Sequence, residues 1–406
     1  MGHRRDARFA AAAMKIDTLQ LVNFRNYDQA SLRFPRMVNV FYGKNGQGKT
    51  NLLEAIFYAA FGLSHRSNRE EDLVRFGQDG LAVLASLERE DGPHRIRCKR
   101  CVENGRWRKE VRIDDKKTAA RDHYGFLNVV MFSPEDLQIV KGEPALRRRF
   151  LDMEIAQTDP LYYDLLVQYN RSLKQRNRLL KDIREEKASR AQLDPWDEAL
   201  AGTAAKLLEK RLANLARLQS IADPIFRTLS EDQETLRLVY DLKANDGEIL
   251  HPTADDGRDW RAFYGESLAA RRFKDILQGT TGIGIHRDDL DPLLNGRPAK
   301  AFASQGQQRC CALALKMSQI EYVRDRAGEY PVLLLDDVMS ELDSSRRRQL
   351  VSFITDKVQT FLTVNDKSLI PAFPSNAYFE VTGGCVRPLE TGPEEGLRED
   401  GGGGTA

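Results

Sequence analysis

The stretch Gly43-Lys44-Asn45-Gly46-Gln47-Gly48-Lys49-Thr50 is a complete G-x-x-x-x-G-K-[ST] phosphate-binding loop. It follows an apolar run at 38–42 that reads as a strand, and a helical pattern at 51–58 comes directly after it. Glycines let backbone N–H groups point at phosphates from close range, and the following helix adds the positive end of its dipole. The stretch therefore predicts an α/β protein with a nucleotide site at a strand–loop–helix junction.

The last two residues of the loop carry its chemistry. Lys49 supplies a mobile positive charge for the β- and γ-phosphates, and Thr50 supplies a hydroxyl for Mg²⁺. A glycine-rich turn before an ordinary helix would not account for this Lys-Thr pair. The sequence thus predicts binding of a nucleoside triphosphate with Mg²⁺.

A second acidic motif lies far along the chain. Pro331-Val332-Leu333-Leu334-Leu335-Asp336-Asp337 is a continuously apolar run ending in two acids, as expected of a strand buried in a parallel sheet. Asp336 is predicted to hold the Mg²⁺ shell, and Asp337 to polarise the attacking water. The alternative is a buried strand that ends at a solvated turn. The many residues between the two motifs predict a nucleotide core that is split by a long insertion. A simple kinase or GTPase brings its two motifs together much sooner in the sequence.

Between these motifs stands Phe302-Ala303-Ser304-Gln305-Gly306-Gln307-Gln308-Arg309, which opens a helix predicted at 310–322. Ser304 is a natural N-cap and Gly306 permits close backbone approach, so the segment predicts an anion site at a helix N-terminus. The alternative is an ordinary capped helix. Ser340-Glu341-Leu342-Asp343 follows the acidic strand, and this order of motifs resembles ATP-binding-cassette (ABC) ATPases. In those enzymes the S-x-G-Q loop of one subunit caps the ATP held by another.

The chain as a whole resembles the RecF family of bacterial recombination and repair proteins, over roughly residues 14 to 385. The matching segments are 19–27, 43–56, 64–66, 132–137, 148–152, 169–177, 286–290, 304–309 and 334–343. The resemblance implies an ABC-type P-loop ATPase head with mixed sheets and an inserted α-helical lobe, related to Rad50 and SMC heads. It implies a protein of gap repair, DNA replication and the SOS response that forms a homodimer on ATP. Its implied partners are double-stranded DNA and single-strand/double-strand junctions, RecO and RecR, and indirectly RecA.

Site residues carry over from the family by motif. Arg25 resembles the arginine that reaches nucleotide phosphates in related heads, and Ser304, Gly306 and Gln307 are expected to contact the γ-phosphate across the dimer. Gln138, or the nearby Glu135, is expected to sense Mg²⁺. The catalytic set implied is Lys49, Asp336 and Asp337.

Two departures from the cassette transporters affect the expected rate. No histidine follows the strand at 360–363, where Thr363, Asn365 and Asp366 stand instead of the transporters' switch residue. Asp337 replaces the glutamate of many cassette ATPases. A shorter carboxylate reaches its water less well, which suits a weak, DNA-stimulated ATPase that serves as a slow switch.

Basic residues are clustered although the net charge is only +2. From Arg171 to Arg190 there are eight Lys or Arg against three acids, and from Arg95 to Arg121 eleven against four. Either cluster is a solvated face or a nucleic-acid surface, because Lys and Arg gain affinity by releasing counterions from phosphates. The first cluster is the preferred DNA site, with contacts predicted at Arg171, Lys174, Arg178 and Lys181.

Residues 1–13 are expected to be a disordered extension, 14–152 and 275–386 the split ATPase head, 153–274 the helical lobe, and 387–406 a disordered tail. Strands are predicted at 16–24 and 38–42, and antiparallel hairpins between 81 and 113 with turns at 91–93 and 104–105. Apolar residues three and four apart predict a helix from 161 to 183, which Asp194-Pro195 breaks, and a second helix that contains residues 200–225.

Five cysteines in 406 residues and the lack of a long apolar run predict a cytoplasmic protein without a membrane span. Two further classes compete with an ATP-gated DNA clamp. An ABC transporter subunit is disfavoured by the basic insertion and the missing switch histidine. A Rad50-like nuclease scaffold is disfavoured because the insertion is short.

Overall fold

The protein's structure, a computed structural model, describes residues 13–67, 69–231, 233–366 and 376–389. The chain divides into two compact units. Unit 1 comprises Met1–Pro134 and Val323–Ala406, and unit 2 comprises Glu135–Tyr322. The boundaries expected near residues 152 and 275 mark the ends of an ATPase head, whereas these units are defined by compactness alone. The expected boundaries therefore stay a prediction.

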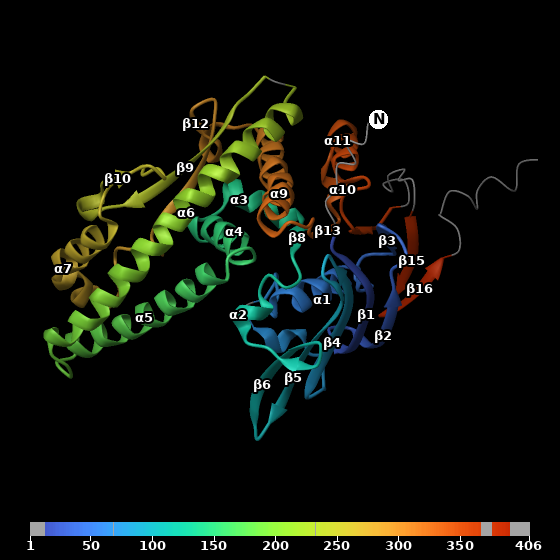
Figure 1. Cartoon of the computed structure of the whole chain (residues 1–406), viewed down its shortest axis with the longest axis horizontal. Coiled ribbons are helices and arrows are strands. Elements are labelled where there is room, and N and C mark those ends of the chain that lie inside the picture. Colours follow the sequence, from blue (N-terminus) through green and yellow to red (C-terminus); the bar gives the residue numbers. More distant parts are fainter. Residues whose placement is uncertain (1–12, 68, 232, 367–375, 390–406) are drawn as a thin grey trace, which may run out of the picture. The chain divides into compact units, whose positions relative to one another are not determined.

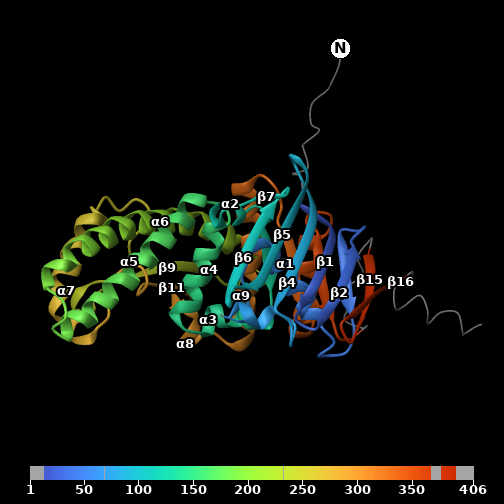
Figure 2. The ribbon, with the colours of Figure 1, turned by 90° about the horizontal axis from the view of Figure 1, so that it is seen from below.

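An antiparallel sheet of six strands, ordered β2-β1-β4-β5-β6-β7, forms one layer of unit 1 (Figure 2). Its strands are β1 (Lys15–Phe24), β2 (Tyr27–Arg33), β4 (Gly80–Arg89), β5 (Gly92–Glu103), β6 (Arg106–Ile113) and β7 (Lys116–Lys117). The hairpins predicted between 81 and 113 are confirmed. Strand β2 was not predicted. It pairs with β1 through the two-residue turn Arg25-Asn26, in which Arg25 has a φ of 54°.

The second sheet of unit 1, ordered β16-β15-β3-β14-β13-β8, contains the predicted nucleotide strands. It is parallel except for the β15–β16 pair. Its strands are β3 (Val38–Tyr42), β8 (Val129–Phe132), β13 (Val332–Asp336), β14 (Thr360–Val364), β15 (Asn376–Thr382) and β16 (Cys385–Leu389). Every residue of β13 is buried, as the apolar run predicted.

Helix α1 (Lys49–Phe61) contacts strands of both sheets, and eleven of its thirteen residues are buried, which is why it lacks a polar face. The parallel sheet's core holds four phenylalanines that pack edge-on, stacked or tilted: Phe34, Phe41, Phe361 and Phe379. The remaining elements of unit 1 are α2 (Ala120–His123), α10 (Val338–Glu341), α11 (Ser344–Ile354) and a 3-10 turn at Glu70–Leu73.

The expected terminal segments are only partly described. Of the extension at 1–13, residues 1–12 lie outside the described residues, and Ala13 forms an isolated bridge with Tyr330. The disordered tail was expected to begin at residue 387, but residues 387–389 belong to β16, which pairs with β15. Residues 390–406 lie outside the described residues.

Unit 2 is built around the two long helices that apolar periodicity predicted, α5 (Pro160–Arg184) and α6 (Asp194–Leu229) (Figure 1). Both begin with proline in the first turn, where a missing N–H costs nothing. The other helices are α3 (Gln138–Lys141), α4 (Pro144–Ala156), α7 (Trp260–Gln278), α8 (Ala299–Phe302) and α9 (Gln305–Ala327), with 3-10 turns at Pro134–Leu137, Arg190–Leu193 and Asn245–Gly247. No helix of the described residues is both long and apolar enough to cross a membrane.

A four-stranded antiparallel sheet, ordered β10-β9-β11-β12, completes unit 2. Its strands are β9 (Leu236–Lys243), β10 (Ile249–Leu250), β11 (Asp289–Leu294) and β12 (Arg297–Pro298). Strands β9 and β10 lie within the range expected to be helical, so the inserted lobe is not purely α. Local periodicity missed them because β9 finds its partner β11 far along the chain.

Candidate nucleotide and DNA sites

The phosphate loop of unit 1 turns between β3 and α1 in a shape that its glycines make possible. A Cβ at Gly43 would lie 2.3 Å from the carbonyl oxygen of Val381, so only glycine fits. Gly48 has a φ of 113° at the N-terminus of α1, a backbone conformation that costs other residues free energy. The loop therefore presents backbone N–H groups at a helix N-terminus, as phosphate binding requires.

Lys49 lies over the loop that it belongs to. It is 8% exposed, and its Nζ donates hydrogen bonds to the carbonyl oxygens of Gly43 at 2.5 Å and Lys44 at 3.0 Å. Burial lowers the pKa of Lys49, while the nearby Asp337 and Asp336 oppose that shift. An ammonium has three donors, so Lys49 keeps donor capacity for a phosphate oxygen.

The predicted acids meet the loop through the parallel sheet. Asp336 ends β13, and its Oδ1 accepts hydrogen bonds from Thr50 and Thr363, both at 2.8 Å. Burial raises the pKa of Asp337, and the positive charge of Lys49 opposes this. The structure thus brings together Lys49, Thr50, Asp336 and Asp337, which are far apart in sequence.

Mg²⁺ fits this donor set. It prefers oxygen ligands and usually keeps several waters beside one or two protein carboxylates and substrate phosphates. The Thr50 hydroxyl and the Asp336 carboxylate supply two oxygens at the mouth of the phosphate loop. No cluster of three or more His, Cys, Asp or Glu among the described residues offers an alternative metal cage.

Side chains from the turn after β1 support the loop, and sequence reasoning quoted them only as part of a family pattern. Asn26 Nδ2 donates to the Gln47 carbonyl at 3.1 Å, and the buried Tyr27 hydroxyl donates to the Gly48 carbonyl at 2.9 Å. Asn51 Nδ2 donates to Asn26 Oδ1 at 2.8 Å. These bonds tie the turn after β1, the start of β2 and the first turn of α1 to the phosphate loop.

Arg25 points to a carboxylate. Its Nε and Nη2 donate to Glu54 at 2.8 Å each, and Nη1 donates to the Asp72 carbonyl at 2.6 Å. Burial alone would raise the pKa of Glu54, but hydrogen bonds from Arg25 and Ser64 outweigh it and the pKa is lowered. The predicted contact between Arg25 and a nucleotide phosphate stays a prediction.

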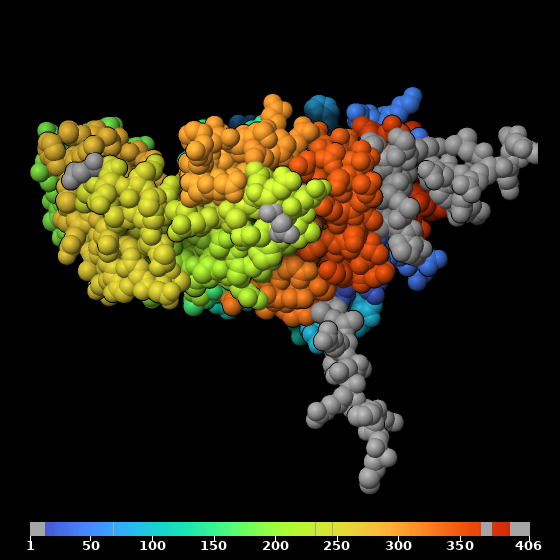
Figure 3. Space-filling view, turned by 90° about the horizontal axis from the view of Figure 1, so that it is seen from above, coloured from blue at the N-terminus to red at the C-terminus, as the bar shows by residue number. Residues whose placement is uncertain are grey.

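The S-x-G-Q segment lies in unit 2 and forms a reciprocal cap on α9. Ser304 Oγ accepts from the Gln307 backbone N–H at 3.2 Å, and Gln307 Oε1 accepts from the Ser304 N–H at 2.6 Å. The predicted N-cap is therefore confirmed, in the form of a capping box. Gln307 Nε2 also donates to Glu234, and Figure 3 shows the yellow-green end of α6 against the orange segment that leads into α9.

Gln138 and Glu135, the two candidates for the Mg²⁺-sensing role, also belong to unit 2. Gln138 is the exposed first residue of α3, and Glu135 lies in the 3-10 turn before it. Asp136, from the same turn, forms a 3.6 Å ion pair with Lys316 of α9. The choice between the two candidates stays a prediction.

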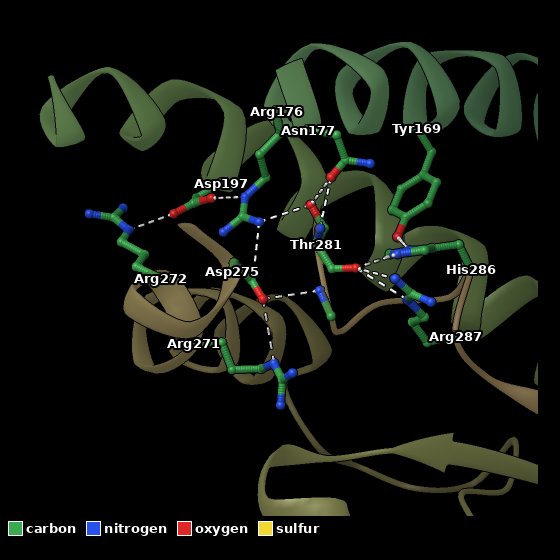
Figure 4. Close-up of polar contacts among 11 residues, drawn as sticks. Tyr169, Arg176, Asn177, Asp197, Arg271, Arg272, Asp275, Thr281, His286 and Arg287 are labelled. Atoms are coloured by element: carbon green, nitrogen blue, oxygen red, sulfur yellow. Dashed lines mark hydrogen bonds and ion pairs between the residues drawn. The ribbon is translucent and has the colours of Figure 1, made fainter. Parts of the chain in front are cut away.

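The predicted DNA residues share one face of α5. Arg171, Lys174, Arg178 and Lys181 are three and four residues apart and all exposed. Arg176, counted in the same cluster, is different because it is fully buried. Its Nε donates to Asp197 of α6 at 2.5 Å, and its Nη1 donates to Asp275 of α7 at 2.8 Å (Figure 4).

Buried polar contacts within unit 2, several of them drawn in Figure 4, involve residues of family motifs that sequence reasoning left without a role. Asn177 accepts from the N–H and hydroxyl of Thr281 at 2.8 and 2.7 Å, and Tyr169 bonds His286 at 2.6 Å. Arg148 Nη1 of α4 donates to the Asp288 carbonyl at 2.6 Å. The motifs at 148–152, 169–177 and 286–290 therefore serve the packing of unit 2.

The second basic cluster lies on the antiparallel sheet of unit 1. Arg97, Arg112 and Lys117 are direct neighbours across β5, β6 and β7, so they share one face of the sheet. Arg97, Lys99, Arg108 and Lys117 on this face are exposed, and Arg112 is half-buried. This surface remains the alternative DNA candidate.

Comparison with known proteins identifies the family. A model of the RecF/RecN/SMC N-terminal domain matches residues 15–376. The DNA replication and repair protein RecF of Heliobacterium modesticaldum is 42% identical over 355 residues, which cover 86% of this chain and 92% of that protein. RecF of Bacillus cereus strain B4264 is 41% identical over 351 residues, with coverage of 86% and 92%.

Solved structures agree. A recombination mediator protein RecF bound to ATP, of the RecFOR pathway, is 33% identical with a TM-score of 0.85, and the match covers 95% of this chain and 100% of that one. The Smc head domain of Pyrococcus furiosus, at 16% identity and a TM-score of 0.53, shares the fold. The chain belongs to the RecF family.

Proposed function

We propose that this protein is an ATP-operated DNA-binding switch of recombinational gap repair and replication maintenance. The observation that carries the proposal is the meeting of Lys49, Thr50, Asp336 and Asp337 at one edge of the parallel sheet. That arrangement suits a triphosphate held by the loop and a Mg²⁺ ion held by Thr50 and Asp336. RecF relatives solved with ATP support the same ligand.

Two chains are needed to complete the site. The capped S-x-G-Q helix presents Ser304, Gly306 and Gln307 at an exposed N-terminus, which is suited to the γ-phosphate bound by a second copy. ATP therefore closes a homodimer, and slow hydrolysis at Asp337 opens it. The protein acts as a weak, DNA-stimulated ATPase that times its stay on DNA.

The DNA partner is a duplex or a junction of single and double strands, held by the exposed cations of α5. The naming of the RecFOR pathway for the solved relatives supports RecO and RecR as partners, and a role in loading RecA follows from mediator activity. These roles belong to the bacterial cytoplasm and to the SOS response to DNA damage.

The competing classes fit less well. A transporter subunit places a histidine after the strand that corresponds to β14, where this chain has Asn365 and Asp366. A Rad50-like nuclease scaffold needs a long coiled coil, whereas α5 and α6 have 25 and 36 residues.

Binding to gapped DNA with and without nucleotide tests the switch and separates it from the transporter class. We expect tighter binding of a labelled gapped duplex with ATP and Mg²⁺ than with ADP, measured by fluorescence anisotropy. Equal affinity in all nucleotide states would contradict a switch, and the absence of any DNA binding would favour the transporter class.

A further inference from the structure

A threonine near the end of β14, Thr363, hydrogen-bonds both residues of the acidic motif. Thr363 is 1% exposed on β14, between β13 and β3 in the parallel sheet. Its register partners are Asp336 on one side and Phe41, just before the phosphate loop, on the other. Its position therefore connects the acidic strand to the strand that leads into the loop.

The Thr363 hydroxyl contacts both acids in different ways. It donates its proton to Asp336 Oδ1 at 2.8 Å, and its oxygen accepts the backbone N–H of Asp337 at 2.9 Å. A hydroxyl has one donor and two acceptor lone pairs, so one small group can serve both residues. Valine has the same shape as threonine and can do neither.

The contact to Asp337 holds an unusual backbone. Asp337 has φ 53° and ψ 23°, the left-handed region that non-glycine residues seldom adopt. This turn takes the chain out of the sheet at Asp337 and into α10, and it sets the direction of the Asp337 side chain. The hydrogen bond from the Asp337 N–H to Thr363 offsets the cost of that conformation.

The hydrogen bond from Thr363 to Asp336 orients the carboxylate that is expected to bind Mg²⁺. Asp336 Oδ1 receives both the Thr363 hydroxyl and the Thr50 hydroxyl of the phosphate loop. One carboxylate oxygen is thus fixed from two sides, by β14 and by the start of α1, which restricts rotation of the carboxylate. A carboxylate that is held in this way would present its oxygen to a Mg²⁺ ion in a fixed orientation beside the phosphate loop.

We propose that Thr363 is a positioning residue for ATP hydrolysis: its hydroxyl sets the placement of the Asp337 carboxylate relative to the ligand oxygens of Asp336 and Thr50. This inference rests on the proposed ATPase switch and adds the residue that aligns its two acids. Thr363 touches neither nucleotide nor water in this role. It acts through the two aspartates.

The test compares Thr363→Val, Thr363→Ser and the control Thr360→Val. Thr360 is also fully buried on β14, but its hydroxyl bonds the Val358 carbonyl and neither acid. Small displacements of catalytic groups cost about a hundredfold in rate, so we expect Thr363→Val to lower kcat by about ten- to a hundredfold. Thr363→Ser and Thr360→Val should stay within about threefold of the wild type.

Two readouts besides hydrolysis separate positioning from general damage. ATP affinity, measured with a fluorescent analogue, should be nearly unchanged in Thr363→Val, and its ATP-bound dimers should persist longer than those of the wild type. Unchanged kcat in Thr363→Val, or equal loss in Thr363→Ser or Thr360→Val, would overturn the inference. Circular dichroism checks folding, and Thr363→Ala takes the place of a valine variant that does not fold.

Failure of the proposed function looks different. In that case the wild type itself would neither hydrolyse ATP nor form dimers with it. A wild type that does both, beside a Thr363→Val variant with the same rate, would remove only the role of Thr363.

Discussion

At the residue scale, the nucleotide site depends on charges that are partly buried together. The Lys49 ammonium lies among two backbone carbonyls of its own loop, and the negative charges of Asp336 and Asp337 act on it. Burial disfavours the charged form and lowers the pKa of Lys49, and the two acids partly offset this. Lys49 is therefore a cation held ready beside the place where the β- and γ-phosphates are expected.

Removal of that cation is the first prediction. We expect Lys49→Ala to weaken ATP binding by at least about tenfold, because charge-assisted hydrogen bonds to phosphate are among the strongest polar contacts. Lys15→Ala, which removes an exposed lysine of β1, is the control and should bind as the wild type does. Titration with a fluorescent ATP analogue measures both. The assignment is wrong if Lys49→Ala keeps the wild-type affinity.

Sequence reasoning reached the loop and the acids because each is a local pattern. It did not reach the support given by Asn26 and Tyr27, or the double role of Thr363. Those contacts depend on which strands become neighbours and in what register. Nothing in the strand at 360–364 itself reveals that Thr363 lies beside Asp336.

At the scale of elements, helix α5 has one buried face and one exposed face with different roles. The inner face carries Tyr169, Arg176 and Leu180, all buried, and the outer face carries the four exposed cations. Arg176 bonds acids on α6 and α7, so the outer face rests on a helix tied to two others. Breaking a buried ion pair costs about 3–5 kcal/mol, so Arg176 belongs to stability and not to DNA binding.

The outer face is tested by neutralising Arg171, Lys174, Arg178 and Lys181 with glutamine. We expect weaker DNA binding and a flatter salt dependence, by about one unit of log–log slope for each phosphate that the variant no longer binds. Titrations of duplex DNA at several salt concentrations measure the slope. The comparison variant neutralises Arg97, Arg112 and Lys117 on the antiparallel sheet. If only that variant loses affinity, the DNA site is on the sheet.

Helices α5 and α6 could be predicted because their apolar residues recur at helical spacing over many turns. Strands β9 and β10 could not, because β10 has two residues and β9 depends on pairing with β11. Charge counting also failed to separate Arg176 from its neighbours. Burial depends on the helices that α5 packs against, which composition does not give.

At the scale of the whole molecule, the nucleotide motifs are divided between two compact units. Lys49, Thr50, Asp336 and Asp337 belong to unit 1, and the S-x-G-Q cap belongs to unit 2. If one ATP contacts the phosphate loop of one chain and the S-x-G-Q cap of another, it stabilises the dimer in which both contacts exist. ATP is therefore expected to favour a dimer, and the proposed switch depends on that dimer.

The dimer is measured by multi-angle light scattering at micromolar protein with and without ATP and Mg²⁺. We predict a monomer without nucleotide and a dimer with ATP. The dimer should persist in Asp337→Asn, which keeps the shape of the side chain but removes the proposed base. Ser304→Arg should stay monomeric while its ATP affinity remains within about threefold of the wild type, since Lys49 still holds the phosphates. A protein that stays monomeric with saturating ATP, even as Asp337→Asn, would contradict the proposed switch.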